Sequence, residues 1–351
     1  MFTIFDDKPN DLPPKLIRLS GVVIAANLFT WGWAYATFRN YPLLLATASI
    51  AYGFGLRHAV DADHIAAIDN VTRKLMLEGK RPISAGFFFS LGHSTVVFAA
   101  SLMIASAVGS LRQRFPELTQ IGADFGTLIS ALFLFAIAAI NVLVLAEVLR
   151  ISRLARRGNP RVEEQLDRLL AQRGLLGRLL RRTVRLMSQS WQMYPLGLLF
   201  GLGFDTATEI GLLGISAAEA SEGLSIWAIL VFPALFTAGM SLVDTGDGIL
   251  MVGAYGWAYV NPTRKLWYNL ALTAISVGIA VAVGTVEACG LVAEKFGLAE
   301  SIAGPASFAA DHFGAIGILV IGLFLASWLA SIAIYRGIER HRTGSILTKL
   351  N

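Results

Sequence analysis

The sequence predicts an all-α polytopic membrane protein, and three observations lead to this fold class. Hydrophobic residues make up 55% of the 351 residues and charged residues 15%, whereas a soluble domain carries about a quarter charged residues. The apolar residues are grouped in blocks, each close to the roughly 20 residues that a membrane-spanning helix needs. Positive charges gather in alternate loops between these blocks. We therefore expect a single transmembrane domain over 1–351 with eight spanning helices.

The first half of the chain supplies four predicted spans and one long basic loop. Positive residues precede the first span and fill the loop after the second span, where Arg73 and Lys74 are found. The basic loop, 150–190, holds eleven Arg, and we expect it to form a cytoplasmic amphipathic helix near anionic lipid rather than a nucleic-acid-binding patch. The four spans are 17–38, 43–69, 83–109 and 122–149.

The second half supplies four more predicted spans. Arg264 and Lys265 lie between the sixth and seventh spans, and further Arg and Lys residues follow the last one. The loops on the opposite side are poorer in positive charge, so the positive-inside rule places both termini in the cytoplasm, which requires an even number of spans. The four spans are 192–216, 225–254, 265–292 and 313–335.

The second predicted span contains the most informative segment, 57–65, which reads Arg-His-Ala-Val-Asp-Ala-Asp-His-Ile. Ionisable groups are costly inside a membrane and mark ion paths, and imidazole with carboxylate suits a divalent transition metal. On a regular helix His58, Asp61 and His64 share one face, while Asp63 points away and can join them only if the helix is distorted. We predict a metal site here; a buried polar network without metal is the alternative.

Polar side chains in other spans extend this candidate site. In the fifth span Asp205 and Glu209 share a face, as Asp244 and Asp247 do in the sixth. The third span contributes His93, and Asp69 falls on the same face as His58. We expect the acids to bind metal, to orient the histidines or to carry protons, with helix packing as the alternative. The predicted metal residues are His58, Asp61, Asp63, His64, His93, Asp205, Glu209, Asp244 and Asp247.

Two short matches indicate an internal repeat. Phe54-Gly55-Leu56 recurs 146 residues later as Phe200-Gly201-Leu202, and Gly92-His93-Ser94 resembles Gly239-Met240-Ser241, 147 residues later. Three spans separate the copies, so spans two and three would run opposite to spans five and six. Such an inverted repeat is common in secondary transporters with a site at the membrane midplane.

Segment 57–65 is similar to the signature of the nickel/cobalt transporter family, NiCoT, of bacterial secondary permeases, and 91–94, 202–209 and 239–245 also resemble motifs of that family. The resemblance implies high-affinity uptake of Ni²⁺, and also Co²⁺, across the bacterial cytoplasmic (inner) membrane. It further implies that His58, Asp63 and His64 belong to the essential set, and therefore a distorted second span. Related efflux proteins share the architecture and often carry a His-rich loop; the long loop here has no His, which favours import.

Other functional classes fit the sequence less well. A single cysteine excludes an internal disulfide and a Cys-based metal cluster. Neither a P-loop string nor a His-Glu-x-x-His string is present, so this chain has no ATPase or zinc-protease motif. A carrier of Zn²⁺ or Mn²⁺ is the closest alternative, and an intramembrane metal-dependent enzyme a remote one. The expected partners are the transported metal ion and the lipid bilayer, with no cofactor and no nucleic acid; the oligomeric state stays open.

Overall fold

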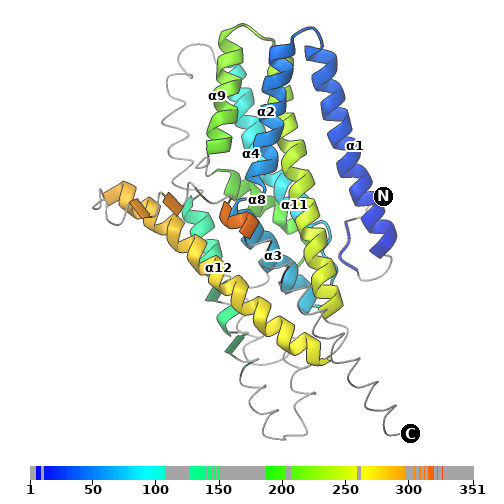
Figure 1. Ribbon diagram of the computed structural model, residues 1–351, viewed down its shortest axis with the longest axis vertical. Helices are drawn as coiled ribbons and strands as arrows, with labels where there is room; N and C mark the ends of the chain where they lie inside the picture. Colours follow the sequence, from blue (N-terminus) through cyan, green and yellow to red (C-terminus); the bar gives the residue numbers. More distant parts are fainter. Residues whose placement is uncertain are drawn as a thin grey trace, which may run out of the picture.

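The computed structural model describes residues 5–8, 12–106, 187–202, 207–258 and 262–296, most of 127–149, and short pieces between 304 and 326. Within these residues every regular element is a helix (Figure 1). Four of the described helices are long and apolar enough to cross a membrane, and the bent pair α2–α3 makes a fifth crossing if it is one broken span. The protein is therefore an all-helical membrane protein. Most of the predicted eighth span, 313–335, and nearly all of the basic loop, 150–190, lie outside the described residues.

The first three helices are α1 (Leu12–Phe38), α2 (Pro42–His58) and α3 (Ala62–Leu77). Proline occupies the first turn of α1 and of α2, where its missing N–H costs no hydrogen bond. The second predicted span is thus broken, with a bend of 51° between α2 and α3. Because α3 continues to Leu77, the prediction that Arg73 and Lys74 lie in a loop was wrong, and both are helical.

The break between α2 and α3 is a short backbone turn. The N–H groups of Val60 and Asp61 donate to the carbonyls of Arg57 and His58 at 3.1 and 3.0 Å. Asp61 then adopts an extended backbone conformation and becomes the N-cap residue of α3. Its side chain makes no capping hydrogen bond and is left to interact with other groups. The break therefore places a carboxylate and two helix ends in the middle of the bundle.

Further helices in the described part of the chain are α4 (Ala85–Ser106), α8 (Met193–Gly201), α9 (Ala207–Ser221), α10 (Ile226–Ile229), α11 (Val231–Ala258) and α12 (Pro262–Phe296). A shorter apolar helix covers Thr127–Leu143. The fifth predicted span is again two helices, because α8 ends at Gly201 and α9 begins at Ala207. α3 and α9 are both followed by a glycine with a φ of 81°, Gly79 and Gly223, which is the left-handed conformation common at helix ends.

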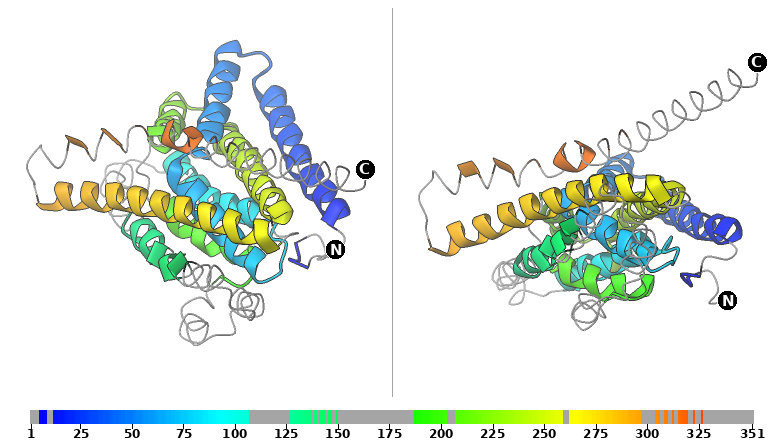
Figure 2. Two further views of the ribbon diagram at one scale, coloured as in Figure 1. Left: turned by 60° about the horizontal axis from the view of Figure 1, so that its bottom comes forward. Right: turned by 90° about the horizontal axis from the view of Figure 1, so that it is seen from below.

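Close helix packing builds the bundle around the broken helices. α2 packs against α11, and α8 packs against α4; α3 also contacts α11, and α9 contacts α4. A Cβ atom at Gly55 would overlap the Phe236 carbonyl, and one at Gly92 would overlap the Tyr194 carbonyl. α1 lies on the outside next to α11, and α12 crosses the bundle obliquely beside α3 (Figure 2).

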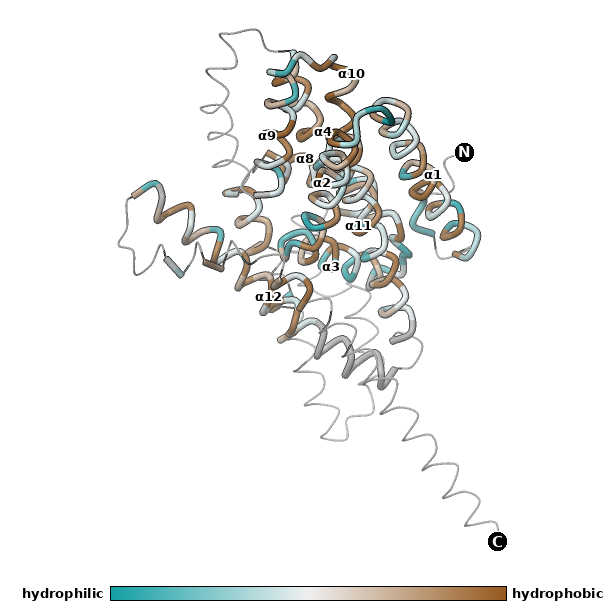
Figure 3. The backbone as a smooth tube through the Cα atoms, turned by 45° about the horizontal axis from the view of Figure 1, so that its top comes forward, coloured by the Kyte–Doolittle hydropathy of each residue, from teal (hydrophilic) through white to brown (hydrophobic). Residues whose placement is uncertain are grey.

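Hydropathy follows this arrangement. Apolar residues cover most of the helices, and hydrophilic stretches mark the turns and the interior near α3 (Figure 3). Large apolar side chains on α1, such as Leu28 and Phe29, are 69% and 74% exposed, as expected of a surface that faces lipid. The polar interior is therefore enclosed by helices whose outer surfaces suit the bilayer.

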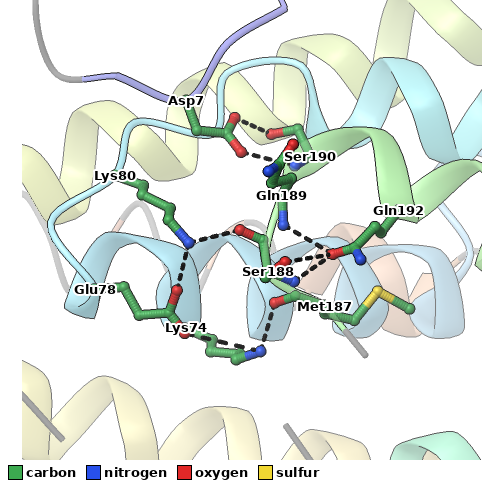
Figure 4. A network of polar contacts seen from close by, with 9 residues as sticks. All are labelled: Asp7, Lys74, Glu78, Lys80, Met187, Ser188, Gln189, Ser190 and Gln192. Atoms are coloured by element: carbon green, nitrogen blue, oxygen red, sulfur yellow. Dashed lines mark hydrogen bonds and ion pairs between the residues drawn. The ribbon is translucent and has the colours of Figure 1, made fainter. Parts of the chain in front are cut away.

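A polar junction ties the N-terminal segment 5–8 to the start of α8 (Figure 4). The Asp7 carboxylate accepts hydrogen bonds from the backbone N–H of Ser190, at 2.7 Å, and from its hydroxyl. The Asp7 carbonyl accepts from the N–H of Arg81 at 2.9 Å, and Lys80 donates to the Ser188 carbonyl at 2.6 Å. Burial raises the pKa of the Asp7 carboxyl above its usual range, and the bonds from Ser190 offset part of this rise.

We expect Asp7→Asn to be at least as stable as the wild type at pH 7. A raised pKa means that folding disfavours the charged form, so stability from Asp7 is lost as the pH rises through that value. Asparagine keeps an acceptor for Ser190 and removes the buried charge. Asp7→Leu should instead lose about 1–3 kcal/mol, because buried Ser190 donors lose their acceptor. Thermal unfolding in detergent measures both variants, and an equal loss in the two would show that the charge itself is needed.

Candidate metal centre

Three imidazole rings meet where α2, α3 and α4 approach one another. His58 is the last residue of α2, His64 lies in the first turn of α3, and His93 lies in the middle of α4. One ring nitrogen of each lies within 4.8 Å of the others, and none of the three residues is more than 2% exposed. His58 and His64 would be about 9 Å apart along a straight helix, yet their ring centroids are 4.6 Å apart. The helix break thus brings the two rings together.

Glu209, in the first turn of α9, completes a close group of ligand atoms. His93 Nε2 lies 2.9 Å from His58 Nε2 and 2.8 Å from Glu209 Oε1, and His58 Nε2 lies 3.9 Å from the same oxygen. With metal–ligand bonds of about 2.0–2.1 Å, adjacent ligands of a square plane are about 3 Å apart and opposite ligands about 4 Å apart. The three distances match three corners of such a plane, a geometry that Ni²⁺ and Cu²⁺ favour with nitrogen and oxygen ligands.

Polar neighbours hold the rings in orientations that turn a nitrogen toward this group. His58 Nδ1 lies 3.4 Å from Asp61 Oδ2 and 3.3 Å from the Thr208 hydroxyl. His64 Nδ1 lies 3.4 Å from the Asp244 carboxylate, while its Nε2 is buried without a hydrogen-bond partner among the described residues. A partner on one ring nitrogen fixes the tautomer and leaves the other available to a metal.

The other predicted site acids surround this group or lie beyond it. Asp63 Oδ1 is buried with no hydrogen-bond partner in the described part of the chain, and the carboxylate interacts electrostatically with His58 and His64. Asp247 lies one helical turn past Asp244 on α11, and both of its carboxylate oxygens are buried without a described partner. Asp205 lies outside the described residues.

The prediction that Asp69 shares a helix face with His58, about three turns away, was wrong. The Asp69 carboxylate accepts hydrogen bonds from the Tyr255 hydroxyl at 2.5 Å and from the Ser276 hydroxyl at 2.6 Å. The prediction failed because α2 and α3 are separate helices with different axes, so one angular projection does not describe both. Asp69 belongs to a second polar region nearer the C-terminal end of α3.

Two aromatic residues that frame the centre were missed by the sequence reasoning. Phe89 packs edge-on against the His64 ring with centroids 4.8 Å apart, and Phe236 lies 5.5 Å from the His58 ring. Both are fully buried and exclude water from one side of the rings. They are separated by 147 residues, the offset of the glycine motifs at Gly92 and Gly239, and this spacing could have identified them.

A glycine from the C-terminal part of the chain also reaches the break. A Cβ atom at Gly317 would overlap the carbonyl of Val60. The short described helical piece around this glycine therefore approaches the backbone between His58 and Asp61. The predicted eighth span contains Gly317, so the centre is covered from that direction as well.

Comparison with known proteins places the chain in a family. It is 54% identical over 322 residues to a high-affinity nickel transport protein of Cupriavidus necator, covering 92% of each chain. It is 52% identical over 318 residues to the hydrogenase nickel incorporation protein HupN of Bradyrhizobium diazoefficiens, covering 91% of this chain and 83% of that one. It is 40% identical over 292 residues to the cobalt transport protein NhlF of Rhodococcus rhodochrous, covering 82% of each.

No solved structure matches the chain. The family model of NicO, described as high-affinity nickel-transport protein, matches residues 44–334. This range includes every residue of the candidate centre, from His58 to Asp247. The chain therefore belongs to the NicO family of high-affinity nickel-transport proteins.

Proposed function

We propose that this protein imports Ni²⁺, and also Co²⁺, across the bacterial cytoplasmic membrane by secondary transport through the His centre. The protein is a transport protein and not an enzyme, as its family shows. The observation that carries the proposal is the buried group formed by His58, His93 and Glu209, whose ligand atoms lie 2.8, 2.9 and 3.9 Å from one another. The metal is the substrate, and no cofactor is invoked.

The chemistry of the donors supports a borderline transition metal. Buried imidazole and carboxylate groups suit Ni²⁺ and Co²⁺, whereas Mg²⁺ and Ca²⁺ prefer a shell of oxygen atoms. Two of the relatives are named for nickel and one for cobalt. The proposed site residues are His58, Asp61, Asp63, His64, His93, Asp205, Glu209, Asp244 and Asp247.

The membrane potential supplies a driving force without ATP. An inside-negative potential favours cation entry by about 2.3 kcal/mol per charge per 100 mV, or about 4.6 kcal/mol for a divalent ion. Accumulation then needs a carrier that binds the ion on one side and releases it on the other. A site whose histidines and Glu209 are buried among the described helices fits such a carrier better than it fits an open pore.

We further propose a single domain with eight spans, cytoplasmic termini and an inverted repeat of spans two–three and five–six. The break between α2 and α3 has a counterpart between α8 and α9, and Asp63 and Glu209 lie in the first turns of the two following helices. The packing of α2 on α11 is matched by that of α8 on α4. Gly79 and Gly223 end the paired helices in the same way. These correspondences support two related halves around one site.

Uptake by the purified protein in proteoliposomes tests the function. We expect an inside-negative potassium diffusion potential to drive accumulation of radiolabelled Ni²⁺, and excess Co²⁺ to compete more strongly than Mn²⁺. Protein-free vesicles and vesicles without a potential are the controls. Accumulation of Zn²⁺ or Mn²⁺ with no transport of Ni²⁺ would overturn the proposal in favour of another divalent-metal carrier.

A further inference from the structure

Buried acidic side chains continue from the His centre along the interface of α3 and α11. The two helices run in the same direction there, because His64 contacts Asp244 and, further along both helices, Asp69 contacts Tyr255. Asp247 lies between these two contacts and interacts electrostatically with both Asp244 and Asp69. The acids thus form a row that leads from the centre toward the C-terminal end of α3.

The acids beyond the centre are deeply buried. Asp69 is 1% exposed and Asp247 is 7% exposed. Asp69 accepts two hydroxyl hydrogen bonds, whereas neither carboxylate oxygen of Asp247 has a partner among the described residues. Neighbouring buried carboxylates repel one another and need a cation nearby to stay ionised.

Arg73 places a cation at the far end of this row. It lies one turn after Asp69 on α3, is 1% exposed, and is one of the largest fully buried side chains. Its guanidinium donates to the Thr273 hydroxyl at 2.8 Å and to Asn70 Oδ1 at 3.3 Å, and it interacts electrostatically with Asp69. These bonds hold a permanent positive charge one turn from Asp69 on the same helix.

We propose that Arg73 is a tethered counter-cation for Asp69. Its guanidinium offsets the negative charge of Asp69 between transport events, and a divalent ion that arrives from the His centre takes over this role as it passes. Once the ion has left, Arg73 again offsets this charge, so that the ion is not recaptured. The inference rests on the proposed transport function and assigns Arg73 a positioning role outside the His centre.

A metal-binding measurement tests the electrostatic part of the proposal. Arg73→Gln keeps hydrogen-bonding capacity and removes the charge, so the uncompensated acids should take up about one Mn²⁺ per chain, because carboxylate oxygens suit this ion. Electron paramagnetic resonance of the full-length protein in detergent detects bound Mn²⁺. The wild type should bind no Mn²⁺ at the same concentration. Thr273→Val, which removes a hydrogen-bond partner of the guanidinium but no charge, should also bind none. The double variant Asp69→Asn/Arg73→Gln should lose the Mn²⁺ that Arg73→Gln binds. Absence of Mn²⁺ binding by folded Arg73→Gln would overturn the proposal.

Transport rates test the role in ion release. In proteoliposomes the maximal Ni²⁺ uptake rate of Arg73→Gln should fall at least about tenfold, which corresponds to about 1.4 kcal/mol, while KM stays equal or falls. Asp69→Asn leaves a surplus positive charge that repels the ion, so it should also be slow. The neutral double variant should be faster than either single variant. A double variant that transports no faster than either single variant would indicate a purely structural network and overturn the proposal. If Arg73→Gln fails to fold, the uptake rate of Asp69→Asn is compared with that of the double variant instead.

The two proposals fail in different ways. His58→Ala removes a ligand of the His centre and leaves the Asp69–Arg73 region untouched. Normal Ni²⁺ uptake by His58→Ala would overturn the proposed function but not the Mn²⁺ result. If His58→Ala is inactive and every Arg73 variant behaves like the wild type, the proposed role of Arg73 is overturned and the proposed transport function is not.

Discussion

Replacing His93 with alanine is expected to abolish Ni²⁺ uptake and to weaken Ni²⁺ binding beyond the about 10–100-fold that loss of a ligand's orienting partner costs. His93 Nε2 is the middle corner of the three-atom group, with contacts of 2.9 Å to His58 and 2.8 Å to Glu209. Its removal leaves His58 Nε2 and Glu209 Oε1, 3.9 Å apart, without the ligand atom that lies close to both. Equilibrium dialysis with radiolabelled Ni²⁺ in detergent measures binding, and proteoliposome uptake measures transport.

A variant on the same helix provides the control for His93→Ala. Ser101 is fully buried on α4, two turns after His93, and its hydroxyl has no hydrogen-bond partner among the described residues. We expect Ser101→Ala to retain normal binding and uptake. Tight Ni²⁺ binding by His93→Ala would show that His93 is a packing residue and that the metal site lies elsewhere.

A single methyl group added at Gly55 is expected to destabilise the protein and stop transport. The new Cβ would overlap the backbone carbonyl of Phe236, which cannot move without displacing α11. Such overpacking costs about 1–3 kcal/mol, occasionally more. α2 and α11 would have to separate close to His58, one turn further along α2. Thermal unfolding and uptake of Gly55→Ala measure the two consequences.

Gly53→Ala is the matched control, two residues earlier in the same helix. No atom lies within 4 Å of a Cβ built at Gly53. Alanine is favoured over glycine inside a helix by about 1 kcal/mol, so this variant should be as stable as the wild type or more stable. Equal stability and transport of the two alanine variants would contradict the close α2–α11 contact.

Composition and hydropathy were sufficient to predict a helical membrane protein, because the length and apolar character of each segment determine whether that segment can span the bilayer. The spacing of acids also identified Glu209, since residues three and four apart share a helix face. Its pairing with His93 joins residues 116 positions apart, and no local pattern encodes that contact. The sequence could therefore nominate a set of candidate residues, while their mutual geometry required the folded chain.

The helix break explains one of the two misassignments. A regular helix over 43–69 would place Asp69 on the same face as His58, whereas the new axis of α3 brings Asp69 to Tyr255 and Ser276. The positive-inside rule placed Arg73 in a loop, because it assumes that Arg and Lys side chains are exposed to water outside the membrane. The groups that make its burial tolerable include Thr273, 200 residues away, and become visible only in the folded chain.

The broken helices also set an electrostatic background at the centre. α3 and α9 both begin there, and α2 ends there at His58. Each helix N-terminus carries a partial charge of about +0.5 and each C-terminus about −0.5. α8 also ends beside the centre, because a Cβ atom at Gly201 would overlap the His93 carbonyl, so the two positive and the two negative helix ends nearly cancel. Asp63 and Glu209 lie in the first turns of α3 and α9, where the positive ends of the helix dipoles favour a negative charge. The helix ends therefore add little net charge to the centre, so its attraction for a divalent cation comes from the carboxylates and imidazoles themselves.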